Sequence, residues 1–243
     1  MRNHNFKTVG ILGGMGPWAT LFFYQKLLEL TPADKDWDHL RVIIDNNPRI
    51  PSRSRHYLYG EESPVAGMVD SCNRLAAYPV DFIVIPCNSA CYFWSEVQKR
   101  VDVPILNIIA VTADAVKRKL PDARLVAVFG GTITYEQKTY EPFLAQHGIR
   151  YVHHSADTQD IVVRLIEQIK QNDLRETEQE FRELIKRVRR DYSVDAVILG
   201  CTELGLYSGL DCRVPIIDSS YELAHYTVVE AKSLKQGGKH GQP

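Results

Sequence analysis

Two cysteines stand at matching positions in two similar segments of the sequence. Cys87 follows Asp81 and a run of aliphatic residues, and Cys201 follows Asp195 and a run of the same kind. Such runs predict strands that are buried on both faces, with each cysteine just past the carboxyl end. Because ligands bind at that end of open α/β sheets, we predict that the two thiols face one cleft.

The chemistry that suits two facing thiols is proton transfer on both sides of one carbon atom. Asn88 and Ser89 follow the first cysteine and Thr202 follows the second, and hydrogen-bond donors there can lower the pKa of a thiol from about 8.5. A single nucleophilic cysteine would need a neighbouring general base such as histidine, which neither segment has. One thiolate that removes a proton and an opposite thiol that returns one would instead invert a stereocentre.

The surroundings of the two cysteines repeat as well. Gly13 and Gly130 end similar aliphatic runs, and Val103 and Val214 open similar Val-Pro-Ile segments at nearly the same spacing as the cysteines. An internal duplication of this kind predicts two similar lobes.

Short aliphatic runs alternate with segments of helical period along the whole chain. The predicted strands are residues 8–12, 42–45, 82–86, 104–107, 125–129, 151–153, 196–199 and 215–217. This alternation predicts an α/β fold of two lobes with mostly parallel sheets, related by a pseudo-two-fold axis, with the active site in the cleft between them. The predicted ranges are 1–115 with 210–232 for the first lobe, 116–209 for the second, and 233–243 for a disordered tail.

Two loops and one helix bring further polar groups to the predicted cleft. Met15 lies in the glycine-rich turn after the first strand, where backbone N–H groups can hold an anion. Arg53 lies in a segment, residues 46–55, that two prolines are expected to fix as a rigid loop. Lys170, late in a helix predicted over residues 160–172, is expected at the same edge of the second lobe.

Composition excludes some classes of partner. The chain has 243 residues, 44% of them hydrophobic, and 29 Lys and Arg against 30 Asp and Glu, so its charge balance indicates neither nucleic acid nor a membrane surface. No apolar run approaches the roughly 18 residues of a spanning helix, and the amino terminus lacks a signal-peptide pattern. With five cysteines expected as thiols, we predict a cytoplasmic protein that acts on a small molecule.

Four segments of the chain carry a family resemblance. They are Gly-Ile-Leu-Gly-Gly-Met-Gly-Pro-Trp-Ala-Thr at residues 10–20, Asn-Asn-Pro-Arg-Ile-Pro-Ser-Arg at 46–53, Pro-Cys-Asn-Ser-Ala at 86–90 and Gly-Cys-Thr-Glu-Leu at 200–204. These segments resemble the motifs of the aspartate/glutamate racemase superfamily, in particular its aspartate racemase branch. The resemblance implies a homodimeric amino-acid racemase for an acidic substrate, aspartate or glutamate, that needs neither pyridoxal phosphate nor a metal.

The same resemblance implies roles for individual residues. Cys87 and Cys201 are the implied catalytic acid/base pair, Arg53 the partner of the substrate carboxylate, and Lys170 the partner of the distal carboxylate. The remaining implied substrate-binding residues are Met15, Asn88, Ser89 and Thr202.

Two departures from the family pattern leave the substrate open. Ser52 stands where the family usually has Asp, and Cys91 stands where it usually has His. The alternatives on the same scaffold are racemisation of a hydantoin or of a non-acidic amino acid, isomerisation of maleate, and decarboxylation of a malonate, which needs only one cysteine. A protein that binds an acidic ligand without catalysis is the alternative from another class. A zinc site at the cysteines lacks the second close pair that structural zinc prefers.

Overall fold

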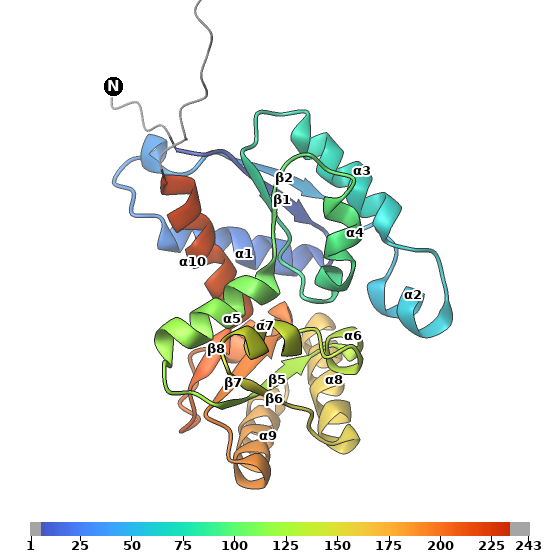
Figure 1. Cartoon of the computed structure of the whole chain (residues 1–243), viewed down its shortest axis with the longest axis vertical. Helices are drawn as coiled ribbons and strands as arrows, with labels where there is room; N and C mark the ends of the chain where they lie inside the picture. Colours follow the sequence, from blue (N-terminus) through green and yellow to red (C-terminus); the bar gives the residue numbers. More distant parts are fainter. Residues whose placement is uncertain (1–5, 234–243) are drawn as a thin grey trace, which may run out of the picture.

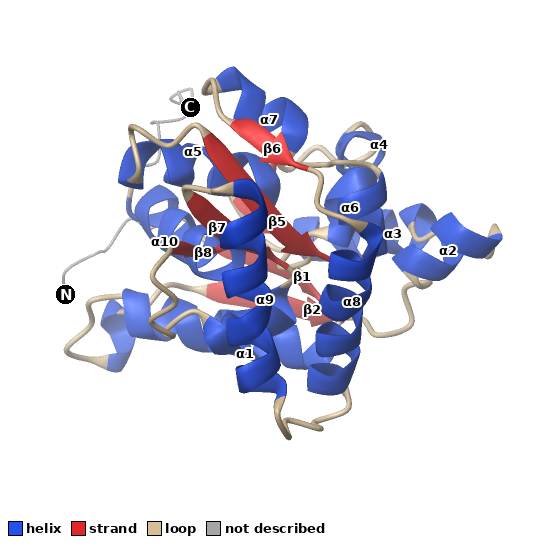
Figure 2. Cartoon of the chain, turned by 90° about the horizontal axis from the view of Figure 1, so that it is seen from below, coloured by secondary structure: helices blue, strands red, loops and turns tan. Residues whose placement is uncertain are grey.

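The first lobe forms around short aliphatic strands whose side chains are largely buried. In the computed structural model, which describes residues 6–233, β1 (Val9–Gly13), β2 (Val42–Asn46), β3 (Phe82–Val84) and β4 (Ile105–Leu106) form a parallel sheet in the order β2-β1-β3-β4. The helices before and around β3 are α1 (Pro17–Leu30), η1 (Asp36–Asp38), α2 (Arg53–Tyr59), α3 (Val65–Ala76), η2 (Ser89–Phe93) and α4 (Trp94–Gln98). Helices flank the sheet, as buried parallel strands require (Figures 1 and 2).

The second lobe repeats this arrangement. Strands β5 (Leu125–Gly130), β6 (Arg150–Val152), β7 (Ala196–Gly200) and β8 (Ile216–Asp218) form a parallel sheet in the order β6-β5-β7-β8. Its helices are α6 (Thr132–Glu136), α7 (Glu141–Gln146), α8 (Ala156–Lys170), α9 (Thr177–Tyr192) and η3 (Thr202–Tyr207). The boundaries of the eight predicted strands are confirmed within two residues, and the matching strand order confirms the two-lobed α/β fold.

Details of the two sheets match as well. The Asp81 carboxylate accepts a hydrogen bond from the Thr8 amide at 2.6 Å, and the Asp195 carboxylate accepts one from the Leu125 amide at 2.9 Å. In each lobe, the Asp just before the cysteine-bearing strand therefore binds the backbone at the start of the neighbouring strand, β1 or β5. The repeated Asp is structural in both copies.

Glycine is required where the first strand of each lobe meets the helix that follows. A Cβ atom at Gly13 would lie 2.4 Å from Thr20, and one at Gly130 would lie 2.6 Å from Thr134. Both distances are shorter than any van der Waals contact allows, so the repeated glycines permit a close approach of strand and helix.

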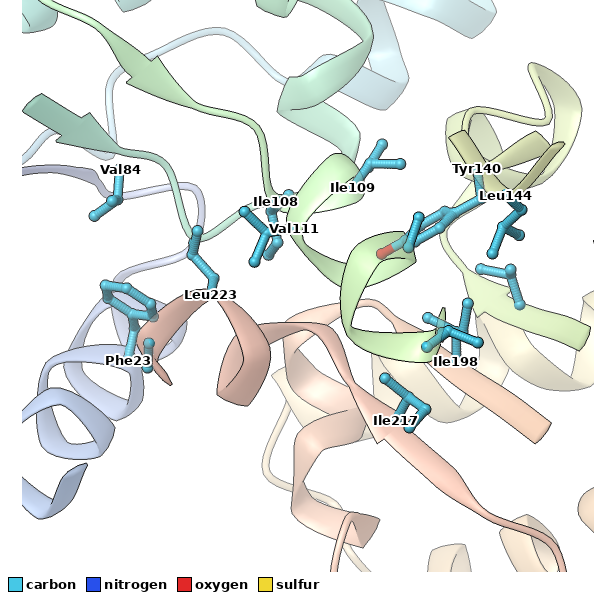
Figure 3. Close-up of a cluster of buried hydrophobic side chains, with 14 of the residues drawn as sticks. Phe23, Val84, Ile108, Ile109, Val111, Tyr140, Leu144, Ile198, Ile217 and Leu223 are labelled. Carbon is cyan, nitrogen blue, oxygen red and sulfur yellow. The ribbon is translucent and has the colours of Figure 1, made fainter. Parts of the chain in front are cut away.

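Two helices connect the lobes. Helices α5 (Ile108–Lys119) and α10 (Ser219–Lys232) pack against each other between the two sheets, and α10 also packs on α1 (Figure 1). Their apolar faces join one buried cluster that contains Val84 of the first sheet and Ile198 of the second (Figure 3). Because the lobes share this core, the position of one relative to the other is fixed by packing rather than by a linker.

Two sequence expectations differ from the fold. The segment from residue 210 was expected to complete the first lobe, but β8 pairs with β7 in the second sheet and only α10 packs on the first lobe. The rigid loop expected over residues 46–55 ends early, because α2 begins at Arg53. Of the predicted tail, residues 234–243 lie outside the described residues.

No helix within residues 6–233 combines the length and the apolar character that crossing a membrane would require.

Candidate active site in the cleft between the lobes

A cavity of about 820 Å³ lies between the two lobes. Its walls come from the β1–α1 turn, α1 and the start of α2 on one side, and from the end of α8, η3 and the start of α10 on the other. Four predicted site residues line it, namely Met15, Arg53, Lys170 and Thr202. Cys87, Asn88, Ser89 and Cys201 do not belong to its lining, although Cys201 directly precedes Thr202 and Glu203, which do.

Arg53 brings a positive charge to the cavity wall. It is the first residue of α2, whose amino terminus is capped by the Ser52 hydroxyl, an acceptor for the Arg55 amide at 3.3 Å. The guanidinium donates to the backbone carbonyls of Pro51 at 3.1 Å and Met15 at 3.3 Å. No carboxylate of residues 6–233 forms an ion pair with it, and its buried Nε–H has no acceptor there. An uncompensated guanidinium of this kind suits an anionic ligand group such as a carboxylate.

Cys201 is paired with a carboxylate. Its thiol donates to Glu203 with a distance of 2.9 Å between Sγ and Oε2, and the Thr202 hydroxyl donates to the same oxygen at 3.2 Å. Burial raises the pKa of Cys201 well above its ordinary value, and the charge of Glu203 and the hydrogen bond to it raise this pKa further, against a lowering by Lys170. At neutral pH this environment keeps Cys201 as a protonated thiol.

Cys87 has a different environment. It follows β3, its side chain is buried with 8% exposed, and its backbone N–H donates to Ile85 at 2.8 Å. Its thiol has no hydrogen-bond partner within the part of the chain that the structure describes. Charge on Cys87 raises the pKa of Cys201, so the two sulfur atoms interact electrostatically. The two equivalent cysteines therefore differ in their surroundings, because in the described chain only the Cys201 thiol has a hydrogen-bond partner.

Asn88 faces the interior. Its side-chain oxygen accepts a hydrogen bond from the Tyr140 hydroxyl at 2.6 Å, and its side-chain nitrogen donates to the Ser219 hydroxyl at 3.0 Å. Ser219 in turn donates to the Leu199 carbonyl at 2.7 Å, so a buried chain of hydrogen bonds joins both lobes behind the cysteines. With its amide in this chain, Asn88 positions the loop that carries Cys87.

This chain yields a prediction on stability. Asn88→Ala removes the acceptor of the buried Tyr140 hydroxyl and the donor to the Ser219 hydroxyl, which keeps its bond to the Leu199 carbonyl. The loss is expected to lower the free energy of unfolding by about 1–3 kcal/mol. Urea unfolding followed by far-UV circular dichroism measures this loss. Asn73→Ala, at an exposed position of α3, is the matched control and should change stability by no more than about 0.5 kcal/mol. Equal effects of the two variants would contradict a structural role for Asn88.

Ser89 and Lys170 occupy opposite lobes of the site. The Ser89 hydroxyl lies 3.5 Å from the place that a Cβ atom of Gly131 would occupy, so it packs across the interface between lobes. The Lys170 ammonium forms an ion pair with Glu167 at 2.8 Å. Burial lowers the pKa of Lys170, but the hydrogen bond to Glu167 and the charges of Cys201 and Glu203 outweigh this and raise it overall. Lys170 therefore stays protonated beside Cys201.

The contact of Glu203 with Cys201, which the sequence did not predict, yields a prediction on pH dependence. Enantiomers have equal free energies, so in a racemase kcat/KM is the same in both directions at every pH, and any asymmetry appears in kcat. When Cys201 acts as the base, kcat rises with pH as its thiol loses a proton. Glu203→Gln removes a charge that raises the pKa of Cys201, so this rising limb should move to lower pH.

The measurement for Glu203→Gln is kcat as a function of pH, determined separately from each enantiomer. Glu29→Gln is the matched control, because Glu29 also lines the cavity but is not among the groups that shift Cys201. Its profile should stay at the wild-type position. A Glu203→Gln profile that stays there as well, or moves to higher pH, would contradict the pairing of Glu203 with Cys201.

The other cysteines lie apart from the cavity. Cys91 joins the packing around the shared core, and burial raises the pKa of its thiol to about 12. Cys72 is fully buried and its thiol pKa is likewise raised to about 12, as befits a core residue. Among residues 6–233 no group of three or more His, Cys, Asp or Glu side chains is arranged to hold a metal ion.

One wall of the cavity was not predicted from the sequence. Trp18 and Phe22 of α1 line it, with 68% and 53% of their side chains exposed, and Leu206 lies on the opposite wall with 56% exposed. The helical period of α1 predicts which residues share a face but not that this face borders a cavity. In the sequence, the one signal for this wall was the position of Trp18 and Phe22 just after the glycine-rich turn.

Two duplicated α/β lobes with a ligand cavity between them define an enzyme scaffold that is found in racemases. The structure is similar to that of the Picrophilus torridus aspartate racemase, with a TM-score of 0.83, 32% identity, and coverage of 95% of this chain and 96% of that one. In sequence, the chain is 31% identical to the broad specificity amino-acid racemase RacX of Bacillus subtilis, covering 90% of this chain and 96% of that protein. The fold is also shared with glutamate racemase RacE1 of Bacillus anthracis, with a TM-score of 0.64, 21% identity, and coverage of 94% and 83%.

The sequence profile described as Asp/Glu/Hydantoin racemase matches residues 12–227. The chain therefore belongs to this family, and it is a racemase and thus an isomerase. The family expected from the four sequence motifs is confirmed.

Proposed function

We propose that this protein racemises an α-amino acid by two-base proton transfer at Cys87 and Cys201. The observation that carries the proposal is the equivalence of the two cysteines: each follows the third strand in sequence of its own four-stranded sheet. A charge on Cys87 raises the pKa of Cys201, which supports the pairing of the two. The cavity beside them offers Arg53, a cation without a carboxylate partner in the described chain, for the α-carboxylate of the substrate.

The proton transfers follow from this arrangement. A thiolate takes the α-hydrogen as a proton, and the electron pair of the broken C–H bond moves into the carboxyl group to give an enediolate. Arg53 stabilises the charge that develops there, which is where preorganised donors contribute most. The opposite thiol then delivers its proton to the other face of the carbon atom, and the electron pair of its S–H bond stays on sulfur. Cys201, whose thiol donates to Glu203, is suited to act as the acid that delivers a proton.

Acidic amino acids are the first candidates for the substrate. The family description and the aspartate racemase of Picrophilus torridus support this choice. Lys170 is placed to meet a distal carboxylate, since it lines the cavity and keeps its charge next to Cys201. The similarity to RacX of Bacillus subtilis, a broad specificity amino-acid racemase, supports a range of substrates wider than aspartate.

The test is exchange of the α-hydrogen with solvent. The full-length protein is incubated in D₂O with each enantiomer of aspartate and glutamate, the α-proton is followed by NMR, and the products are resolved by chiral chromatography. Exchange with inversion supports the proposal and identifies the substrate. Ligand-induced thermal stabilisation without exchange would indicate a binding protein instead, and would overturn the catalytic proposal.

We infer in addition that the protein is a cytoplasmic homodimer that binds neither nucleic acid nor membranes. Exposed apolar side chains on adjacent helices, Leu28 of α1 and Val229 of α10, support an interface between two copies. All five cysteines are free thiols, which suits a reducing compartment.

A further inference from the structure

The substrate cavity has an apolar side that an aspartate side chain does not need. Trp18 and Phe22 line it from α1 and Leu206 from η3, and more than half of each side chain is exposed. Ile169 and Leu174 extend the same lining beside Lys170. We refer to these five residues as the apolar wall.

Exposed apolar side chains that gather at a cavity stabilise a complex only when a ligand buries them. A large aromatic residue left in water forgoes the free energy that burial would provide, and each methylene group that a ligand buries there gains roughly fourfold in affinity. An aspartate side chain has one methylene group, so it covers little of such a surface. A longer apolar side chain covers much more.

The cations of the cavity point to the same class of ligand. Lys170 is paired with Glu167 at 2.8 Å, and Lys26 is paired with the buried Asp218 at 3.2 Å. Only Arg53, among the Lys and Arg residues that line the cavity, has no carboxylate partner in the described chain. One uncompensated cation matches the α-carboxylate that every amino acid carries. A neutral side chain leaves the two existing ion pairs in place, whereas a second carboxylate must compete with Glu167 for Lys170.

We propose that the apolar wall is a side-chain subsite, and that the enzyme racemises neutral amino acids with long apolar side chains, such as methionine, leucine and phenylalanine, as well as acidic ones. Phe22 and Trp18 are the specificity-determining residues of this subsite. The inference rests on the proposed racemase function and assigns the substrate class of the same site.

The test compares two neighbouring positions of α1. Phe22 lines the cavity with 53% of its side chain exposed, and Leu21 is 52% exposed but does not belong to the lining. Phe22→Ala should lower kcat/KM for methionine, leucine and phenylalanine by about tenfold, the discrimination that an apolar subsite provides. Leu21→Ala should change it by less than about twofold. Because both side chains are half exposed, neither variant loses core packing, and Trp18→Ala provides a second variant of the subsite.

The readout is α-hydrogen exchange in D₂O with chiral analysis, applied to the three apolar amino acids and to aspartate and glutamate. Inversion of methionine that Phe22→Ala weakens and Leu21→Ala preserves supports the subsite. Exchange confined to aspartate or glutamate overturns the subsite and leaves the racemase function in place. Equal effects of Phe22→Ala and Leu21→Ala overturn the role of the wall. Exchange with none of the five overturns the proposed function itself.

Discussion

Cys87→Ser and Cys201→Ser are each expected to abolish racemisation, with inversion falling about 10²–10⁴-fold, the usual contribution of one positioned acid/base group. A serine hydroxyl is a far weaker acid than a thiol, so it neither supplies a base at neutral pH nor returns a proton readily. The loss should be similar for both variants, because inversion needs a group on each face of the carbon atom.

Solvent exchange in the two variants should separate the roles of the cysteines. In D₂O the remaining cysteine of each variant can remove the α-proton of one enantiomer and return a deuteron to the same face. Cys87→Ser and Cys201→Ser should therefore exchange opposite enantiomers without inverting them. NMR of the α-proton with each enantiomer in turn would show this, and would assign each cysteine to its face.

The matched control for these variants is Cys212→Ser. Cys212 is a partly exposed cysteine of the second lobe that does not line the cavity, so its replacement should leave inversion within about twofold of the wild-type rate. Near-wild-type inversion in Cys87→Ser or in Cys201→Ser would rule out the two-base mechanism and return attention to a single-thiol reaction.

The fold was predictable because local pattern and internal duplication agree. Each aliphatic run is short and bounded by turn residues or helical segments, and the second set of runs repeats the first. The same duplication also explains the one misplaced strand. Val214 repeats Val103, so β8 is the counterpart of β4 and belongs beside β7 as β4 belongs beside β3.

The site was predictable only where residue type and strand position decide it. Cys87 and Cys201 stand at fixed places after their strands, so the sequence was enough to pair them. Asn88 was expected to face the substrate, but the partner that turns its amide inward is Tyr140, 52 residues further along the chain. The bond from Cys201 to Glu203 depends on side-chain rotamers, and the exposure of Phe22 depends on where the second lobe lies. The spacing of residues along the chain predicts none of these three features.

Arg53→Met is the second variant with a large expected effect, a fall in kcat/KM of about 10²–10³-fold, comparable to the loss of an oxyanion-hole donor. Among the described residues, the Arg53 guanidinium is the one cation of the cavity without a carboxylate partner. The negative charge of the transition state develops on the carboxylate that it is proposed to hold. Arg53→Lys keeps the charge but loses the planar fork, so we expect it to recover part of the activity.

Arg53 also donates to the Met15 carbonyl, so a structural explanation must be separated from a substrate contact. Arg55→Met is the matched control on the same helix. Arg55 pairs with Glu61 on the surface and does not line the cavity, so its loss should change kcat/KM by less than about threefold. Thermal unfolding with and without substrate provides the second readout: Arg53→Met should keep its own melting temperature within a few degrees and lose the stabilisation by substrate. If substrate still stabilises Arg53→Met as it does the wild type, the α-carboxylate is held by another group, and the backbone N–H groups of the Met15 turn become the next candidates.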